Sequence, residues 1–103
     1  MELILCTVAN EENAKLIART LVEEKLAACV NISTPLTSIY FWKDKIVEDA
    51  ELLLIIKTKK QLFKKIENRV KELHTYEVPE IISLEVKEGS KEYLDWAEAA
   101  VCK

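Results

Sequence analysis

Two segments of this chain are apolar at nearly every position, and they constrain its fold more than any other feature. Every residue from 52 to 56 is Leu or Ile, so a strand formed there presents apolar side chains on both faces. The segment 3–8 has the same character, which is typical of a strand at the centre of a sheet. A sheet that contains both strands therefore needs an apolar cover on each face.

The spacing of the other apolar residues predicts one α+β domain over residues 1–103. We expect strands at 3–8, 29–42 (bent or bulged at Thr34–Pro35), 46–57 and 81–86, and helices after Asn10, after Thr58 and after Ser90. This order is that of a ferredoxin-like split β-α-β two-layer sandwich with an extra C-terminal helix. The second and third strands form a long hairpin in this arrangement.

Several polar residues predict where the elements begin and turn. Asn10 is an N-cap for the first helix, and Thr58 with Gln61 forms a capping box for the second. Ser90 caps the last helix, and Asp44 tolerates the left-handed conformation that a tight hairpin turn demands.

The ferredoxin-like arrangement leaves one face of the sheet without helices. Since the central strands are apolar on both sides, that face would be a larger apolar patch than soluble monomers usually expose. Another copy of the chain is the simplest cover, so we expect a symmetric oligomer. The hairpin, with Tyr40, Phe41 and Trp42, is expected to pair with a neighbouring subunit.

Composition excludes several classes of protein. The formal net charge of −3 gives little support for nucleic-acid binding. The sequence contains neither a signal peptide nor a membrane-spanning run, so we expect a cytoplasmic protein without a membrane partner. Cys6, Cys29 and Cys102 form an odd set without a closely spaced pair, which indicates reduced thiols and not a disulfide framework.

Two residues are candidates for metal chemistry. His74 lies at a helix-to-strand junction beside Tyr76, where the simplest interpretation is that it caps the helix and packs against the tyrosine ring. Cys6 lies on a central strand, where it is expected as a small core residue. Thiolate and imidazole ligands suit copper or zinc, however, and a Cys6–His74 pair is a chemically sensible site.

The usual enzyme signatures are missing from the sequence. It contains no glycine-rich phosphate loop, HExxH, GxSxG or CxxC motif. Lys57 and Thr58 at a strand end could hold an anion, but a capped helix explains them as well. We therefore predict a protein that is not an enzyme and has no catalytic residues.

Five motifs together resemble the CutA family of divalent-cation-tolerance proteins over nearly the whole chain. They are Cys6-Thr7 followed by Asn10-Glu11-Glu12, the run 26–32, Ser38-Ile39-Tyr40 with Trp42, the run 51–58, and the segment His74-Thr75-Tyr76-Glu77-Val78-Pro79-Glu80-Ile81. Tyr93-Leu94-Asp95-Trp96 fits the end of the family pattern.

The resemblance implies a homotrimer similar in shape to the PII signalling proteins, with a role in tolerance of copper or another divalent cation. It also implies that Cys6 and His74 bind the metal ion. A second family histidine is replaced here by Leu73, which removes one ligand from that set. Thr75 stands where the family usually has Pro, and Asp44 where it usually has Gly, and neither change threatens the fold.

Three functions follow as hypotheses. The first is a metal-responsive trimer that binds a divalent cation weakly through Cys6 and His74. The second is a PII-like signalling trimer, in which Tyr40, Trp42, Lys57 and Tyr76 line clefts between subunits and bind a small anionic ligand. The third is a structural trimer that anchors a partner protein, for which the sequence offers no specific motif.

Overall fold

A five-stranded antiparallel sheet forms the centre of the structure, a computed structural model that describes residues 1–102. The elements are β1 (Glu2–Val8), α1 (Glu11–Glu23), β2 (Cys29–Ile32), β3 (Leu36–Trp42), β4 (Lys45–Thr58), the short 3₁₀ helix η1 (Lys60–Leu62), α2 (Phe63–Leu73), β5 (Ile82–Glu85) and α3 (Lys91–Ala100). The strands lie in the order β2-β4-β1-β5, and β3 extends the sheet as a second partner of β4. The predicted ferredoxin-like α+β fold is confirmed.

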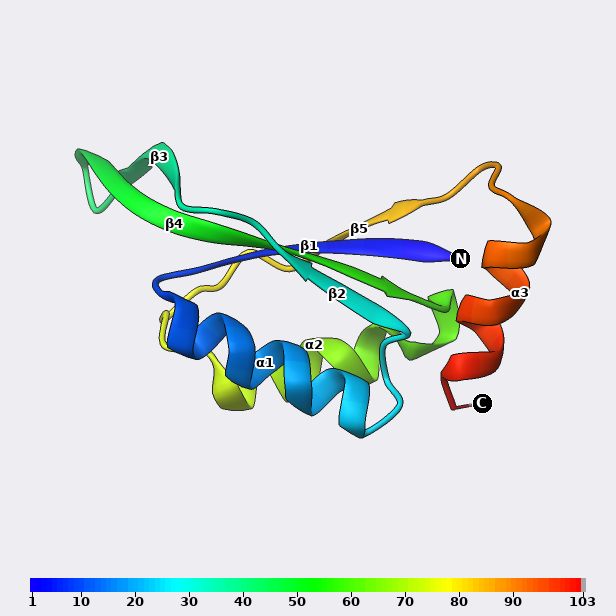
Figure 1. Ribbon diagram of the computed structural model, residues 1–103. Coiled ribbons are helices and arrows are strands. Elements are labelled where there is room, and N and C mark those ends of the chain that lie inside the picture. The colour runs from blue at the N-terminus through cyan, green and yellow to red at the C-terminus, as the bar shows by residue number, and fades with distance from the viewer. Residues whose placement is uncertain (103) are drawn as a thin grey trace.

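One face of the sheet packs on the helices. Helices α1 and α2 both lie below it, and α3 lies at the end away from the hairpin (Figure 1). In β1 and in β4 from Leu52 onward alternate residues are buried, and Ile4, Leu54 and Ile56 have no exposed surface. These side chains meet Ile17 and Ile66 of the two helices in the hydrophobic core. The alternation read from the sequence therefore describes the core correctly.

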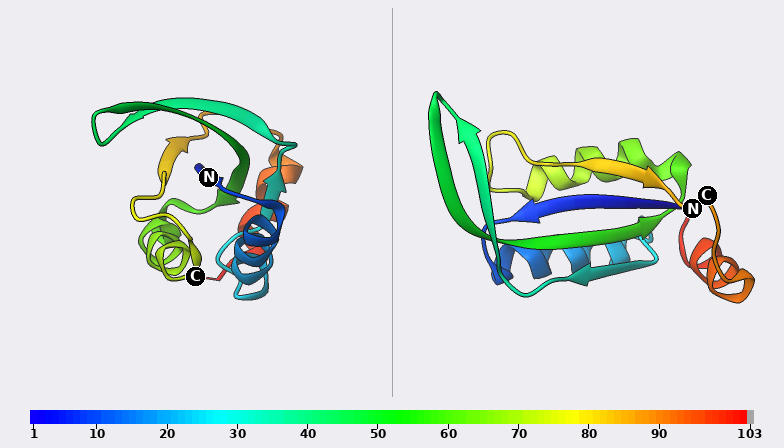
Figure 2. Two further views of the ribbon diagram at one scale, coloured as in Figure 1. Left: turned by 90° about the vertical axis from the view of Figure 1, so that its left-hand side faces the viewer. Right: turned by 90° about the horizontal axis from the view of Figure 1, so that it is seen from above.

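The opposite face of the sheet, which we call the bare face, carries an apolar stripe. In the pairing of the strands, Leu5 lies opposite both Ile55 and Ile82, and Leu3 lies opposite Leu84. Cross-strand partners share a face of a sheet, so these side chains form one surface together with Leu53. Figure 2 shows this face without a covering helix from the described part of the chain. Ile82 and Leu84 are each about half exposed, at 52% and 51%.

A bulge separates β2 from β3. Ile32 pairs with Leu54 of β4, and Leu36 pairs with Glu51, so four steps along one strand match three along the other. The extra residue lies where the Thr34–Pro35 interruption was expected. Ser33 stabilises the bulge, because its hydroxyl accepts a 2.8 Å hydrogen bond from the backbone N–H of Leu53.

The hairpin formed by β3 and the first half of β4 projects beyond the helices (Figure 1). Trp42 pairs with Lys45, which leaves a two-residue turn of Lys43 and Asp44. Both turn residues have positive φ, at 49° and 62°, as a tight hairpin turn of the right twist requires. The left-handed conformation predicted for Asp44 is confirmed, and Lys43 shares it.

The N-terminal signal of α1 is confirmed, because the Asn10 side chain accepts a 2.8 Å hydrogen bond from the N–H of Asn13. The predicted capping box of Thr58 and Gln61 is wrong. Thr58 is the last residue of β4, and its buried hydroxyl donates to the carbonyl of Leu26 instead. Helix α2 starts later, at Phe63 after a 3₁₀ turn, and without a side-chain cap.

Three further expectations need correction. Ser90 occupies the N-cap position of α3, but its side chain makes no capping hydrogen bond. The apolar spacing of the segment after Asn10 predicts that Val22 is buried with Leu21, but Val22 is 43% exposed and the buried stripe of α1 ends at Leu21. The last strand is shorter than expected and begins at Ile82.

Candidate functional site

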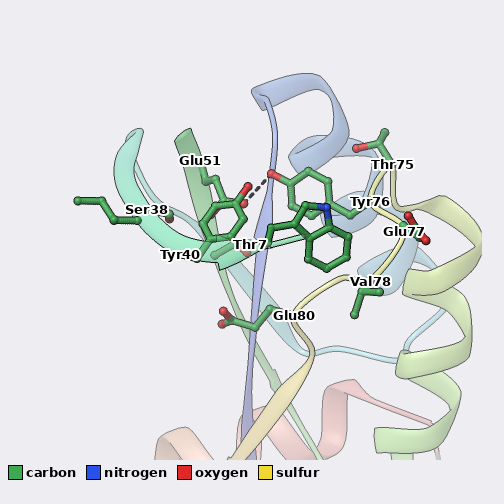
Figure 3. Close-up of a pocket in the computed structure, with 11 residues that line it drawn as sticks. Thr7, Ser38, Tyr40, Glu51, Thr75, Tyr76, Glu77, Val78 and Glu80 are labelled. Carbon is green, nitrogen blue, oxygen red and sulfur yellow. Dashed lines mark hydrogen bonds between the residues drawn. The ribbon is translucent and has the colours of Figure 1, made fainter. Parts of the chain in front are cut away.

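A pocket of about 670 Å³ opens at the base of the hairpin, a volume typical of small-ligand sites. Its lining comes from β1, β3, β4 and the segment between α2 and β5, whose sticks are drawn in Figure 3. The lining residues are Thr7, Ser38, Ile39, Tyr40, Trp42, Glu51, Thr75, Tyr76, Glu77, Val78 and Glu80. Sheet register explains the site: Ser38, Tyr40 and Trp42 alternate along β3, so they share one face with Glu51 of β4.

Glu51 and Tyr76 form the inner wall of this pocket. The Tyr76 hydroxyl donates a 2.6 Å hydrogen bond to the Glu51 carboxylate, which Figure 3 marks as a dashed line. Glu51 is only 5% exposed although it carries a charge. Burial of the phenol, followed by its hydrogen bond to Glu51, raises the pKa of Tyr76 well above its usual value. Tyr76 therefore stays a neutral donor to the carboxylate.

Carboxylates give the pocket a negative character. Glu51, Glu77 and Glu80 line it, and none of the lining residues within the described part of the chain is Lys or Arg. Lys43 approaches from the hairpin turn, where its ammonium lies 3.9 Å from the Glu77 carboxylate and 5.7 Å from the centroid of the Trp42 ring. A site with this charge disfavours the small anionic ligand expected from the sequence and favours a cation.

His74 is fixed by hydrogen bonds to both ring nitrogens. Its Nδ1 accepts a 3.0 Å hydrogen bond from the N–H of Tyr76, so Nε2 carries the proton and donates to the carbonyl of Thr7 at 2.7 Å. The imidazole also packs on the Tyr76 ring, with centroids 4.7 Å apart. Packing on Tyr76 matches the simple structural interpretation, while the cap of α2 comes from the His74 backbone N–H, which donates to Val70.

Cys6 lies in the core beside the same carbonyl. Its thiol is fully buried and contacts the Thr7 oxygen at 3.8 Å, so Cys6 and His74 share one hydrogen-bond acceptor. Burial, with smaller contributions from Glu80 and Glu51, raises the pKa of the Cys6 thiol to about 12. The thiol is therefore protonated at neutral pH, whereas a metal ion binds the thiolate.

The environment of this pair does not fit a resident divalent cation. A metal ion on Nε2 would need the other tautomer, whose Nδ1 proton would face the N–H of Tyr76. The thiol would also have to lose its proton in a buried site that disfavours the charge. Within residues 1–102, no group of three or more His, Cys, Asp or Glu side chains is arranged to hold a metal ion.

The structure brings three of the four predicted ligand residues together. Tyr40, Trp42 and Tyr76 surround the pocket, but Lys57 lies at the other end of β4. Its ammonium lies 5.5 Å from the centroid of the Tyr93 ring of α3. Sequence reasoning placed Glu51 and Glu80 in family motifs but assigned them no role in the pocket. The sequence features that could have identified them are a charged residue at the edge of an apolar strand, for Glu51, and a charged residue beside Pro79, for Glu80.

A model of the family described as CutA1 divalent ion tolerance protein matches residues 2–100 of the chain. The chain belongs to this family. The resemblance of its motifs to CutA proteins is thereby confirmed. The family description names ion tolerance and not a reaction.

CutA relatives match the chain in sequence and in structure. The divalent-cation tolerance protein CutA of Thermus thermophilus is 58% identical over 95 residues, which cover 92% of this chain and 92% of that protein. A solved structure of the T. thermophilus protein has a TM-score of 0.96 at 54% identity and covers 99% of this chain and 100% of that chain. The chain matches only 52% of a longer relative, the chloroplastic protein CutA 1 of Oryza sativa, at 46% identity over 90% of this chain.

The compartments of these CutA proteins differ. A solved structure described as the periplasmic divalent cation tolerance protein CutA of Archaeoglobus fulgidus has a TM-score of 0.93 at 39% identity, covering 97% of this chain and 98% of that chain. The cytoplasmic location expected from the sequence therefore stays a prediction. No helix among the described residues has the length and apolar character needed to cross a membrane.

Proposed function

We propose that this CutA1 chain acts in divalent cation tolerance as a homotrimer that binds a ligand and does not catalyse a reaction. The apolar stripe of the bare face carries the oligomeric part of this proposal, and membership of the family carries the link to divalent cation tolerance. The side chains of the stripe on β5 are about half exposed, and burying such surface contributes about 25 cal/mol per Å². In a single chain this surface stays in contact with water, whereas association with other copies would bury it and gain that free energy.

The hairpin supports association through a second surface. Phe41 and Ile46 pair on the side of the hairpin opposite Tyr40 and Trp42. Ile39 lies two positions from Phe41 on the same strand face, although it also contributes to the lining of the pocket. The exposed fractions of Ile39, Phe41 and Ile46 are 67%, 69% and 77%. Exposed aromatic and aliphatic groups on a projecting hairpin suit an interface between subunits.

Sedimentation tests the oligomeric state. We expect the wild-type chain to sediment at three times its mass of 11.8 kDa. Leu84→Lys places a charge in the apolar stripe and should produce folded monomers. Leu16→Lys is a matched control, because Leu16 on α1 is equally exposed, at 49%, but lies outside the stripe. A wild-type particle of single-chain mass at micromolar concentration would refute the proposal.

Copper titration tests the ligand pair predicted from the sequence. Because Cys6 is a protonated core thiol and both ring nitrogens of His74 are hydrogen-bonded, we expect Cys6→Ser and His74→Ala to change copper affinity by less than about twofold. Loss of copper binding in both variants, with the fold intact by circular dichroism, would instead support Cys6 and His74 as ligands. Calorimetry on the oligomer gives the affinity directly.

A second candidate function is ligand sensing of the PII type. The observation that favours it is the pocket that Tyr40, Trp42 and Tyr76 share. A ligand that binds the folded state raises the unfolding temperature by mass action. A thermal-shift screen of metabolites of both charges tests this function, and a screen in which no compound shifts the unfolding temperature would contradict it.

A further inference from the structure

We infer that the pocket at the base of the hairpin binds a small organic cation, an ammonium or guanidinium compound, between aromatic rings and glutamates. The rings are those of Tyr40, Trp42 and Tyr76, and the buried carboxylate is that of Glu51. This inference names the ligand class for the second candidate function and rests on it. It does not depend on a metal site at Cys6 and His74.

The aromatic lining suits a cation more than a neutral ligand. The face of an aromatic ring attracts a positive charge within about 6 Å of its centroid. Lys43 already uses this property, because its ammonium lies 5.7 Å from the centroid of the Trp42 ring while it pairs with Glu77. A side chain of the protein thus shows that an ammonium group is accommodated by one aromatic ring and one carboxylate of the pocket.

The carboxylates supply the charge that recognises the ligand. Glu51 is almost fully buried, and the contact that satisfies it is one phenol hydroxyl from Tyr76. A buried carboxylate is costly unless it is paired with a positive charge. Glu77 and Glu80 add further negative groups to the lining. The field inside the pocket is therefore negative where the ligand would lie.

The size and chemistry of the pocket favour an organic cation over a metal ion. The described residues form no cluster of three metal ligands, and about 670 Å³ is the volume of a small-molecule site. Thr7, Ser38 and Thr75 line the same space, and a hydroxyl can hydrogen-bond to polar groups of an amine. An inorganic ion would leave the three aromatic rings without a role.

Fluorescence of Trp42 can report the binding. The chain has two tryptophans, so Trp96→Phe on α3 leaves Trp42 as the single reporter. In this background we would titrate choline, methylguanidinium and, as the anionic probe, inorganic phosphate. We expect a saturable change with at least one of the two cations and none with phosphate. Glu80→Gln should weaken the cation by about tenfold or more, since it removes a charge from the site.

Glu98→Gln is the matched control, because it removes the same charge from an exposed position on α3. It should leave the affinity within about twofold. The inference is overturned if neither cation gives a saturable change, or if Glu80→Gln and Glu98→Gln behave alike. A saturable response to phosphate alone would overturn the cation class but keep the ligand-sensing function. Silence toward all three probes, with Trp42 shielded from acrylamide in the oligomer, would mean that a neighbouring subunit fills the pocket.

Discussion

The hydroxyl of Tyr76 donates to the carboxylate of Glu51 over 2.6 Å, and this bond connects the segment after α2 to the middle of β4. The two residues lie 25 positions apart in the sequence. The same segment is also held by His74, whose imidazole packs on the Tyr76 ring. One wall of the pocket therefore depends on a single phenol.

Tyr76→Phe should destabilise the fold by about 1–3 kcal/mol, the usual cost of leaving a buried polar group without its partner. Glu51 would keep its burial but lose its donor. Urea unfolding measures the change. Tyr93→Phe is the control, because Tyr93 is 41% exposed and its ring contact with Lys57 survives the substitution. Equal stability of Tyr76→Phe and wild type would show that the bond contributes nothing.

Cys6 should make the stability of the fold dependent on alkaline pH. Its pKa in the folded chain is about 12, against 9.0 for an ordinary thiol, so the folded state holds its proton more tightly. The contribution is complete below pH 9 and is lost as the pH rises toward 12. Urea unfolding across this interval should show a steeper loss for wild type than for Cys6→Ala. Parallel curves would contradict the assignment, and Cys29→Ala should follow wild type.

Asp44→Gly should stabilise the chain by about 0.5–1 kcal/mol, because a residue with a β-carbon is strained at positive φ and glycine is not. The φ of Asp44 is 62°. Glu48→Gly, in the extended part of β4, should lower stability by a similar amount. Thermal unfolding of both variants checks the opposite signs. A loss of stability in Asp44→Gly would mean that its side chain has a role in the turn.

Thr58→Val should lower the free energy of unfolding by about 1–3 kcal/mol, since it leaves the buried Leu26 carbonyl without the hydroxyl. Thr58→Ser keeps the donor and should cost less. Gln61→Ala should change stability by less than about 0.5 kcal/mol, because Gln61 is exposed and takes no part in a cap. If Gln61→Ala cost as much as Thr58→Val, the capping box would form in solution after all.

Much of the fold could be predicted because its signals are local or periodic. The alternating burial of β1 and β4, the Asn10 cap and the left-handed Asp44 each follow from a few neighbouring residues. Thr58 was misassigned because a hydroxyl can satisfy a distant carbonyl as well as a helix end. Nothing near Thr58 in the sequence reveals that Leu26, 32 positions away, provides the acceptor.

The site was predicted only in part, because its charge is assembled by tertiary structure. Tyr40, Trp42 and Tyr76 were recognised as aromatic residues in family motifs, and the structure brings them together. The carboxylates that set the polarity come from β4 and from the segment before β5. Lys57 had the right chemistry for an anion but lies at the wrong end of its strand, beside Tyr93.

The bulge at Ser33 determines which side chains of the hairpin lie on each of its two faces. Without the additional residue, the even-numbered positions of β3 would continue the side of Val30 and Ile32, whose partners Ile56 and Leu54 belong to the core. Because of it, Tyr40 and Trp42 emerge beside Glu51 instead. Deleting one amino acid between 33 and 35 would invert this parity. Tyr40 and Trp42 would then lie on the face opposite Glu51, and Ile39 and Phe41 would lie on the face of Glu51. A register shift of one residue therefore decides whether polar or apolar side chains of β3 lie beside Glu51.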